Sequence, residues 1–183
     1  VIGDPIGDKI FIARTFDGGE NWQGIPAANI PAADKGEAFF ASSGTNVRKL
    51  SKQEAVFVSG GLRARLFIRN KKIDLPIIQG KESTGANSMA VKNKKCLVVV
   101  GGDFNTRDDT TKNCVITNDG GKTWTKIDGI AGVPERTYVN QIICSQHNRN
   151  VAYVTFNHHR YGDFHPYVYK TTDGGKTWTA IQH

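Results

Sequence analysis

The chain has 183 residues, of which 38% are hydrophobic and 9% aromatic, enough to bury a core and too many for a disordered segment. Its longest apolar runs, such as 96–100, have the length of a strand and fall well short of the roughly 18 residues of a membrane-spanning helix. The net charge of +7 is spread over separate basic clusters at 48–52, 63–72 and 92–95, with no nucleic-acid-binding motif. We therefore expect a globular domain with no membrane span and no nucleic-acid partner.

Residues 1–6 lack the basic start and the apolar run of a signal peptide, so we expect any targeting segment to lie upstream of Val1. The three cysteines, Cys96, Cys114 and Cys144, stand in apolar, strand-like runs, which is typical of small core residues. A disulfide between Cys96 and Cys114 would need an oxidising compartment, and the expected hairpin register places the two out of opposition.

One eight-residue segment, Thr-x-Asp-Gly-Gly-x-x-Trp, occurs three times, at 15–22, 117–124 and 171–178. Its defining residues are Thr15, Asp17, Gly19 and Trp22; Thr117, Asp119, Gly121 and Trp124; and Thr171, Asp173, Gly175 and Trp178. The last two copies are 54 residues apart, and the first two are 102 apart, about twice that. An internal repeat of this kind indicates a repeat architecture in which one unit has lost its motif.

The missing copy is expected near residue 68. There an apolar run, 64–69, is followed by a polar turn and a second run, 70–75, without the Asp-Gly-Gly core. Upstream of each hairpin stand two further β-rich runs: 37–42 with 54–59, 87–92 with 96–101, and 138–144 with 151–156. The pattern predicts four strands in each repeat.

Four antiparallel strands per unit, without helical periodicity, are typical of a propeller blade. A β-sandwich is the alternative, but it gives no reason for one identical turn at the same point of each unit. We predict an all-β fold, a partial β-propeller with about three and a half blades. The expected blade segments are about 1–25, 26–76, 77–128 and 129–183, forming one domain. Because closed propellers typically have about four to eight blades, we also expect the parent protein to supply further blades.

The repeated turn has a structural explanation. Asp-Gly between two strands favours a hairpin, because glycine accepts positive φ and aspartate bonds the backbone of its own turn. The threonine hydroxyls can add to this bonding, and each tryptophan can cover the hairpin and pack towards a neighbour. We therefore interpret Asp17, Asp119 and Asp173 as turn residues and not as catalytic carboxylates or calcium ligands.

These segments resemble the Asp-box, or BNR, repeat. Families with this repeat include sialidases, sortilin receptors, xyloglucanase-type glycoside hydrolases and photosystem II stability and assembly factors. Residues 1 to about 125, with the segments 3–6, 13–19 and 36–40, look most like bacterial secreted proteins grouped with the assembly factors. The last 45 or so, with 153–160 and 167–173, are more similar to the sortilin and xyloglucanase branch. The resemblance implies a β-propeller whose ligand face lies opposite the Asp-boxes, and a periplasmic or secreted location.

Candidate functional residues lie in the loops expected on that opposite face: 3–8, 59–65, 102–112 and 157–166 within blades, and 26–36, 76–86 and 128–137 between blades. The ligand-face candidates are Arg63, Arg65, Asp103, Asn105, Arg107, Asp109, His158, His159, Arg160 and Tyr161, with Glu82, Arg136 and His165 nearby. Converging Arg, Asp and Tyr side chains would suit a sugar or an acidic group. Ordinary solvated loops have the same composition, and this alternative stays open.

Three further chemistries could be placed at this face: glycoside hydrolysis, an oxidoreductase reaction and metal binding. Glycoside hydrolysis needs two carboxyls across the mouth, for which Asp108 and Asp163 are the candidates. The sialidase form is disfavoured because its Arg-Ile-Pro start is absent, and no dinucleotide, haem or flavin motif supports an oxidoreductase. A metal site at His158, His159, Asp163 and His165 is disfavoured because adjacent residues of an extended chain point apart. We expect no metal and no cofactor.

The sequence thus favours a module that binds a protein or carbohydrate partner at the loop face, with a glycoside hydrolase fragment as the alternative.

Overall fold

The computed structural model describes residues 1–40, 43–51, 54–106, 109, 111–127, 129–148 and 150–182. They form β-sheets with two short 3₁₀ turns, η1 (Ala27–Asn29) and η3 (His159–Tyr161). Among them is no helix with the length and apolar character needed to cross a membrane.

Four sheets follow one another along the chain, and the strand pairs of the described residues are antiparallel. The first contains β1 (Ile2–Ile6), β2 (Lys9–Arg14) and β3 (Gln23–Gly24). The second contains β5 (Val47–Lys49), β6 (Ala55–Val58), β8 (Arg65–Ile68) and β9 (Lys71–Asp74). The third contains β10 (Thr84–Val91), β11 (Leu97–Asp103), β12 (Cys114–Thr117) and β13 (Thr125–Lys126). The fourth contains β14 (Tyr138–Cys144), β15 (Ala152–His158), β16 (Asp163–Thr171) and β17 (Thr179–Ala180).

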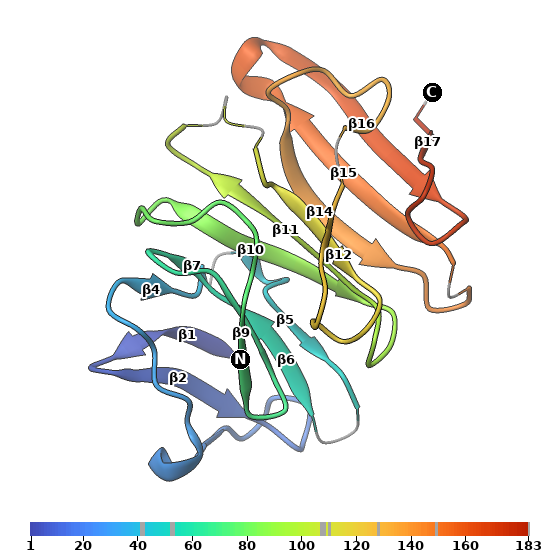
Figure 1. Cartoon of the computed structure of the whole chain (residues 1–183). Helices are drawn as coiled ribbons and strands as arrows, with labels where there is room; N and C mark the ends of the chain where they lie inside the picture. The colour runs from blue at the N-terminus through green and yellow to red at the C-terminus, as the bar shows by residue number, and fades with distance from the viewer. Residues whose placement is uncertain are drawn as a thin grey trace.

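Figure 1 shows the sheets side by side in chain order, from the blue first sheet to the orange last one, without closure into a ring. The fold is therefore all-β, with four-stranded antiparallel sheets arranged as the blades of a partial propeller. This confirms the predicted fold class.

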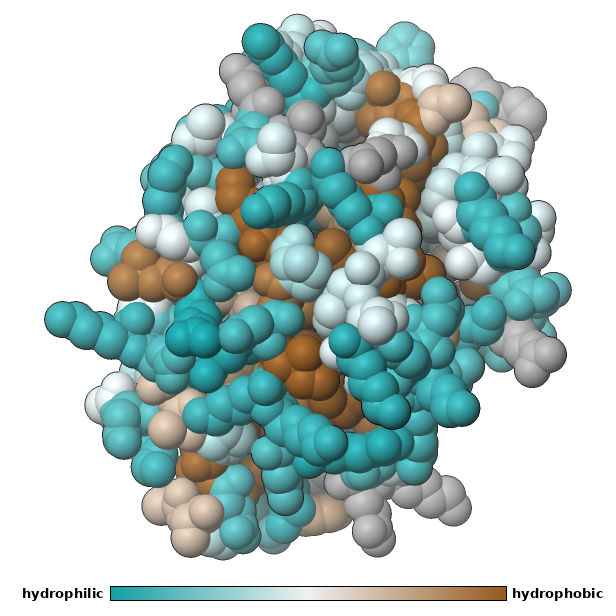
Figure 2. All heavy atoms as spheres, in the orientation of Figure 1, coloured by the Kyte–Doolittle hydropathy of each residue, from teal (hydrophilic) through white to brown (hydrophobic). Residues whose placement is uncertain are grey.

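Strand β11 shows how successive blades share a core. Leu97 and Val99 belong to the apolar cluster on one face of the third sheet, whereas Val98 and Val100 belong to the cluster on the other. Because consecutive side chains of a strand point to opposite faces, the run 97–100 is buried on both sides. Each such side chain contributes about 1.5–3 kcal/mol through burial. The surface in Figure 2 is mainly hydrophilic, with apolar residues showing between the polar ones.

The unit that lacks the Asp-box still forms a hairpin, as predicted, but with a different turn. Strands β8 and β9 pair from Arg65–Asp74 to Ile68–Lys71, leaving only Arg69 and Asn70 between them. Both have positive φ, 48° and 61°, as a two-residue type I′ turn requires. The Asp-box hairpins have a much longer loop, so this unit keeps the two strands of the repeat but not its turn.

The prediction that the first strand of the second blade spans 37–42 is wrong. Only β4 (Glu37–Ala38) is extended there, and it pairs with β7 (Gly60–Gly61) at the edge of the third sheet. The chain turns at Phe40, which has a φ of 39°, and the buried Asn46 side chain donates to the carbonyl oxygen of Phe39. The innermost strand is instead β5. Residues 41 and 42 lie outside the described part of the chain.

The cysteine register agrees with the expectation that Cys96 and Cys114 stand apart. Cys114 pairs with Val100, four residues along the strand from Cys96, a separation of about 13 Å at the usual rise of a strand. All three cysteines are free thiols. Burial raises the pKa of the Cys114 thiol to about 12, so this thiol is protonated at neutral pH.

Candidate functional site

The Asp-box turns lie at one end of the blades. The N–H of Gly120 donates to the carbonyl of Lys95 in the β10–β11 turn at 2.8 Å, and Gly174 donates to Asn150 in the β14–β15 turn at 3.0 Å. The β11–β12 and β15–β16 connections leave the other end of these strands (Figure 1). We call that end, with the connections between successive sheets, the loop face.

Each Asp-box forms the hydrogen bonds of its own turn. The hydroxyl of Thr117 donates to Asp119 at 2.8 Å and accepts from the N–H of Gly121 at 2.9 Å. Asp119 also accepts from the hydroxyl of Thr123 at 2.6 Å. The same bonds recur around Asp173, and the bond from threonine to aspartate recurs at Asp17. These bonds account for the threonine and aspartate side chains of the motif as turn chemistry.

The hydrogen bonds hold the three aspartates in their charged form. The pKa of Asp119 lies well below its usual range because the Thr123 side chain donates to it, and Thr177 has the same effect on Asp173. At Asp17 the main cause of the lowered pKa is the backbone N–H of Asn21. A carboxyl that stays ionised far into the acid range has no use as a general acid near neutral pH.

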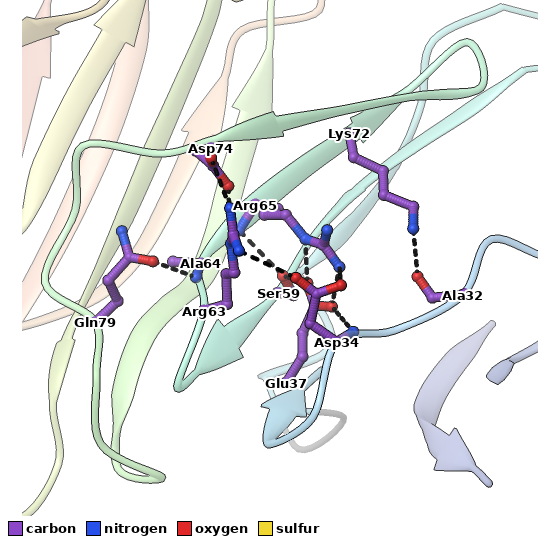
Figure 3. A network of polar contacts seen from close by, with 10 residues as sticks. All are labelled: Ala32, Asp34, Glu37, Ser59, Arg63, Ala64, Arg65, Lys72, Asp74 and Gln79. Atoms are coloured by element: carbon purple, nitrogen blue, oxygen red, sulfur yellow. Dashed lines mark hydrogen bonds and ion pairs between the residues drawn. The ribbon is translucent and has the colours of Figure 1, made fainter. Parts of the chain in front are cut away.

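Arg63 and Arg65 are engaged in ion pairs, as Figure 3 shows. Arg65 pairs with the buried carboxylate of Glu37, its Nε donating at 2.9 Å, and its side chain is only 8% exposed. Arg63 bridges Asp34 at 3.3 Å and Asp74 at 3.0 Å. Burial alone would lower the pKa of Arg65, but the hydrogen bond and charge of Glu37 raise it overall. Arg65, at the start of β8, and Arg63, just before it, therefore tie this part of the second sheet to Asp34 and to Glu37 of β4.

The acidic residues near the β11–β12 connection are also bonded. Asp103 is fully buried, accepts from the N–H of Asn105 at 2.9 Å and contacts Lys81 at 3.4 Å. Burial would raise its pKa, but hydrogen bonds, led by that from Ser83, hold it well below the usual range. Asp109 accepts from the Thr111 hydroxyl, which lowers its pKa in the same way. The candidates Arg107 and Asp108 lie outside the described residues.

The β15–β16 connection brings the histidine cluster and Asp163 to the loop face. His158 stacks on Tyr161 with ring centroids 4.5 Å apart, and His159 stacks on Phe164 at 5.2 Å. Asp163 accepts from the Tyr167 hydroxyl at 2.6 Å, which lowers the pKa of the carboxyl. Arg160 belongs to η3 and is exposed. In the described part of the chain, no three His, Cys, Asp or Glu residues are grouped to hold a metal ion.

A cavity of about 470 Å³ opens beside these loops, between the third and fourth sheets and next to the segment that joins β4 to β5. Its described lining consists of aromatic, amide and hydroxyl groups and glycine backbone: Phe40, Ser43, Ser83, Gly85, Asn87, Gly102, Phe104, Tyr138 and Asn140. None of these described residues is charged. Since Gly85 and Gly102 lie at the start of β10 and the end of β11, the cavity belongs to the loop face.

Asn87 and Asn140 occupy equivalent places in this cavity. Each is the unpaired residue of a register shift in an innermost strand, between Ala86 and Ser88 in β10 and between Val139 and Gln141 in β14. A β-bulge of this kind turns a side chain out of its regular alternation and is common beside binding sites. The two residues are 53 positions apart, close to the 54 between the last two Asp-boxes, a spacing from which the pair could have been found.

Some polar atoms of Asn87 have hydrogen-bond partners, and one has none. Its Nδ2 donates to the Tyr138 hydroxyl at 2.7 Å, and its backbone carbonyl accepts from the Ser43 hydroxyl. Its Oδ1 is buried without a hydrogen-bond partner. None of the residues that line this cavity is among the candidates predicted from the sequence.

Comparison with known proteins relates the chain to Asp-box proteins. The family model BNR/Asp-box repeat matches residues 115–126 and 169–180. A comparison with curated proteins found no match. Two solved structures are similar over most of the chain. One, described as YCF48 bound to D1 peptide, has a TM-score of 0.51 and 17% identity and covers 75% of this chain. The other, the GH74 xyloglucanase from Xanthomonas campestris, has a TM-score of 0.53 and 13% identity and covers 95%.

At these identities the likeness concerns the fold. This chain spans 38% of the YCF48 chain and 27% of the xyloglucanase chain. The likeness to the sortilin branch stays a prediction. Taken together, the repeated turns, the sheet order and these comparisons show that the chain carries BNR/Asp-box repeats on a partial β-propeller fold.

Proposed function

We propose that this chain is a non-catalytic binding module that holds a protein partner at the loop face. The supporting observation is the chemistry of that face. It presents a cavity whose described lining residues are uncharged, together with exposed aromatic and basic side chains, whereas Asp103, Asp109 and Asp163 are bonded within the protein. The solved structure described as YCF48 bound to D1 peptide shows that a propeller of this fold binds a peptide.

The carboxyl groups weigh against the hydrolase alternative. A glycoside hydrolase needs a general acid whose pKa is raised so that it is protonated near neutral pH. Asp103, Asp109 and Asp163 all have pKa values below their ordinary range. These three described candidates therefore suit charged structural or binding roles better than proton donation. The similarity to the xyloglucanase concerns the fold, and it does not support a hydrolase activity in this chain.

Two assays test the proposal. In the first, the chain is exposed to an array of random peptides. In the second, its hydrolytic activity is assayed on xyloglucan and other β-glucans. We expect saturable peptide binding and no release of reducing ends. Arg160→Ala, on the loop face, should weaken peptide binding, while Lys176→Ala, in an Asp-box turn, removes a comparable charge from the other end and should leave it unchanged. Turnover of a β-glucan that is lost in Asp163→Asn with the fold intact would refute the proposal.

We also propose that further blades of the parent chain pack against the first sheet, and that the protein acts in the periplasm or outside the cell. Trp22 supports the first point. It is 50% exposed, while Trp124 and Trp178 pack against the two apolar clusters. Fractionation of cells that express the parent protein tests the location.

A further inference from the structure

The cavity between the third and fourth sheets has the features of a ligand site of its own. We propose that Asn87 and Asn140 form a pair that binds the main chain of an extended, uncharged peptide segment, with an aromatic or large apolar side chain of that segment held beside Phe40 and Phe104. This deepens the proposed function, on which it rests, by naming the site and the chemistry of its ligand.

The same β-bulge occurs in the innermost strands of two consecutive blades. Asn87 and Asn140 each stand five residues before a residue whose N–H closes the next turn, Lys92 bonding to Cys96 at 3.0 Å and Ser145 to Val151 at 2.9 Å. They are therefore the same position in consecutive blades. At that position the register shifts in both strands, so each asparagine leaves the regular ladder of its sheet. Two neighbouring blades thus bring the same amide side chain to one cavity.

The side chain of Asn87 also has a hydrogen-bond acceptor without a partner. Leaving a buried carbonyl oxygen without a partner costs free energy, and Asn87 Oδ1 is such an atom. Turning the amide would not relieve this, because the Tyr138 hydroxyl, 2.7 Å away, can bond only one of the two amide heteroatoms, as acceptor or as donor. Ser43 holds the backbone carbonyl of the same residue. One polar atom of the Asn87 amide thus lacks a partner within the protein, and a ligand could supply that partner when the side chains that cover the atom move aside.

The chemistry of the lining selects the kind of ligand. An asparagine amide carries a donor and an acceptor side by side, the same pair that each peptide unit of an extended chain presents. The described residues of the lining carry no charge with which to bind an acid or a base. A ligand with a charged group here would lose its hydration without gaining an ion pair. An extended main-chain segment without charged side chains offers the matching donor and acceptor and brings no charged group into the cavity.

The aromatic groups of the lining form a pair against which a side chain of the ligand can pack. Phe40 and Phe104 meet edge to face, with centroids 6.1 Å apart and planes at 85°. The ring of Phe40 also lies against backbone, since a Cβ on Gly60 would stand 2.3 Å from its Cε2. A third aromatic or aliphatic side chain packs well against an edge-to-face pair of this kind. Phe104, 47% exposed, keeps the pair accessible.

The probe for this site is the blocked tripeptide acetyl-Gly-Phe-Gly-amide, titrated into the ¹⁵N-labelled chain and followed by amide chemical shifts. We expect shifts centred on Gly85, Gly102 and Asn140. Asn87→Leu and Asn140→Leu should each weaken the affinity at least tenfold. Asn118→Leu is the matched control, since it makes the same change in an Asp-box turn at the other end of the blade, at a position where the other copies have Phe16 and Thr172.

Two further measurements test whether the cavity recognises the peptide main chain and whether it binds a sugar instead. A tripeptide N-methylated at the phenylalanine should bind at least tenfold more weakly, because it lacks the N–H that an asparagine oxygen accepts. Cellotetraose should leave the same amides unshifted. Asn140 is exposed, so Asn140→Leu keeps the test valid even if Asn87→Leu unfolds the chain.

No response of the wild type to the tripeptide, equal affinity in Asn140→Leu, or cellotetraose binding in its place would overturn the assignment of this cavity. The proposed function would survive the first two results if array peptides still bind the loop face, and would fail only if loop-face variants leave that binding unchanged or if the chain hydrolyses a glycan.

Discussion

Ile73, on the outer strand of the second sheet, lies against Gly121 of the Asp-box in the third. A Cβ on Gly121 would stand 3.0 Å from Ile73 Cδ1, and one on Gly175 would stand 3.8 Å from Ile116 Cδ1 in the preceding sheet. At Gly19 only Trp22 of its own turn lies within reach. The second glycine of the motif is thus a contact between blades as well as a turn residue.

This contact predicts unequal costs for the same substitution. Gly121 and Gly19 both have positive φ, 89° and 107°, so an alanine at either is strained by about 1–2 kcal/mol. Gly121→Ala must in addition push against Ile73, for about 1 kcal/mol or more. Urea unfolding should therefore show a larger loss of free energy in Gly121→Ala than in Gly19→Ala. Equal losses would mean that the blades do not meet at this glycine.

The tryptophans of the same turns should differ in a similar way. Trp124 packs against the larger apolar cluster, so Trp124→Ala should cost about 3 kcal/mol. Trp22 is half exposed and donates only to the carbonyl of Gly19, so Trp22→Ala should cost about 1 kcal/mol or less. Iodide quenching of fluorescence in variants that keep a single tryptophan checks the exposure independently. A Trp22 as protected as Trp124 would indicate that the first sheet is covered in solution.

Local chemistry explains what could be predicted from the sequence. Asp-Gly-Gly turns and alternating apolar residues act over a few positions, so the hairpins, including 65–74, follow from the residues themselves. The type of turn at Arg69 and Asn70 does not, because neither is the glycine that usually marks a type I′ turn. The misplaced strand at 37–42 has an equally local pattern, which was overridden by the burial of Phe39 and the bond from Asn46.

The candidate site was harder to predict because it depends on pairing between distant strands. Asn87 and Asn140 look like ordinary polar residues of two strands until the register shows that each stands in a bulge. Arg65 looked like a ligand-binding arginine because its partner, Glu37, is 28 positions away. Loop composition directs attention to the end of the blades where the cavity lies, but it does not indicate which side chains are held by neighbours.

The Arg65–Glu37 pair predicts a large effect from removing one charge. Their side chains are 8% and 0% exposed, and an uncompensated buried charge costs about 3–5 kcal/mol. Arg65→Met and Glu37→Met should each destabilise the chain by about this amount in urea. The double variant should recover much of the loss, since it buries no charge. Two losses that simply add would show that the ion pair is not a coupled unit. Arg63→Met, at an exposed pair, is the control and should cost about 1 kcal/mol or less.

The Asp-box carboxylates predict a loss of stability in acid. Their pKa values are lower in the folded chain than in the unfolded one, so their contribution is complete above the unfolded value of about 4. It declines as the pH falls from there towards the folded values, because the unfolded state then binds more protons. The midpoint of thermal unfolding should therefore drop below about pH 4. Asp119→Asn and Asp173→Asn together should flatten that dependence, and an unchanged slope would show that other groups cause it.

Hydrogen–deuterium exchange of the chain, with and without the tightest-binding peptide from the array, tests the central claim most directly, because it reports which end of the blades meets the partner. A binding module of the proposed kind should show slower exchange at 83–87, 102–106 and 138–144, with unchanged exchange in the Asp-box turns at 118–123 and 172–177. Protection confined to those turns, with the cavity strands unaffected, would contradict the account.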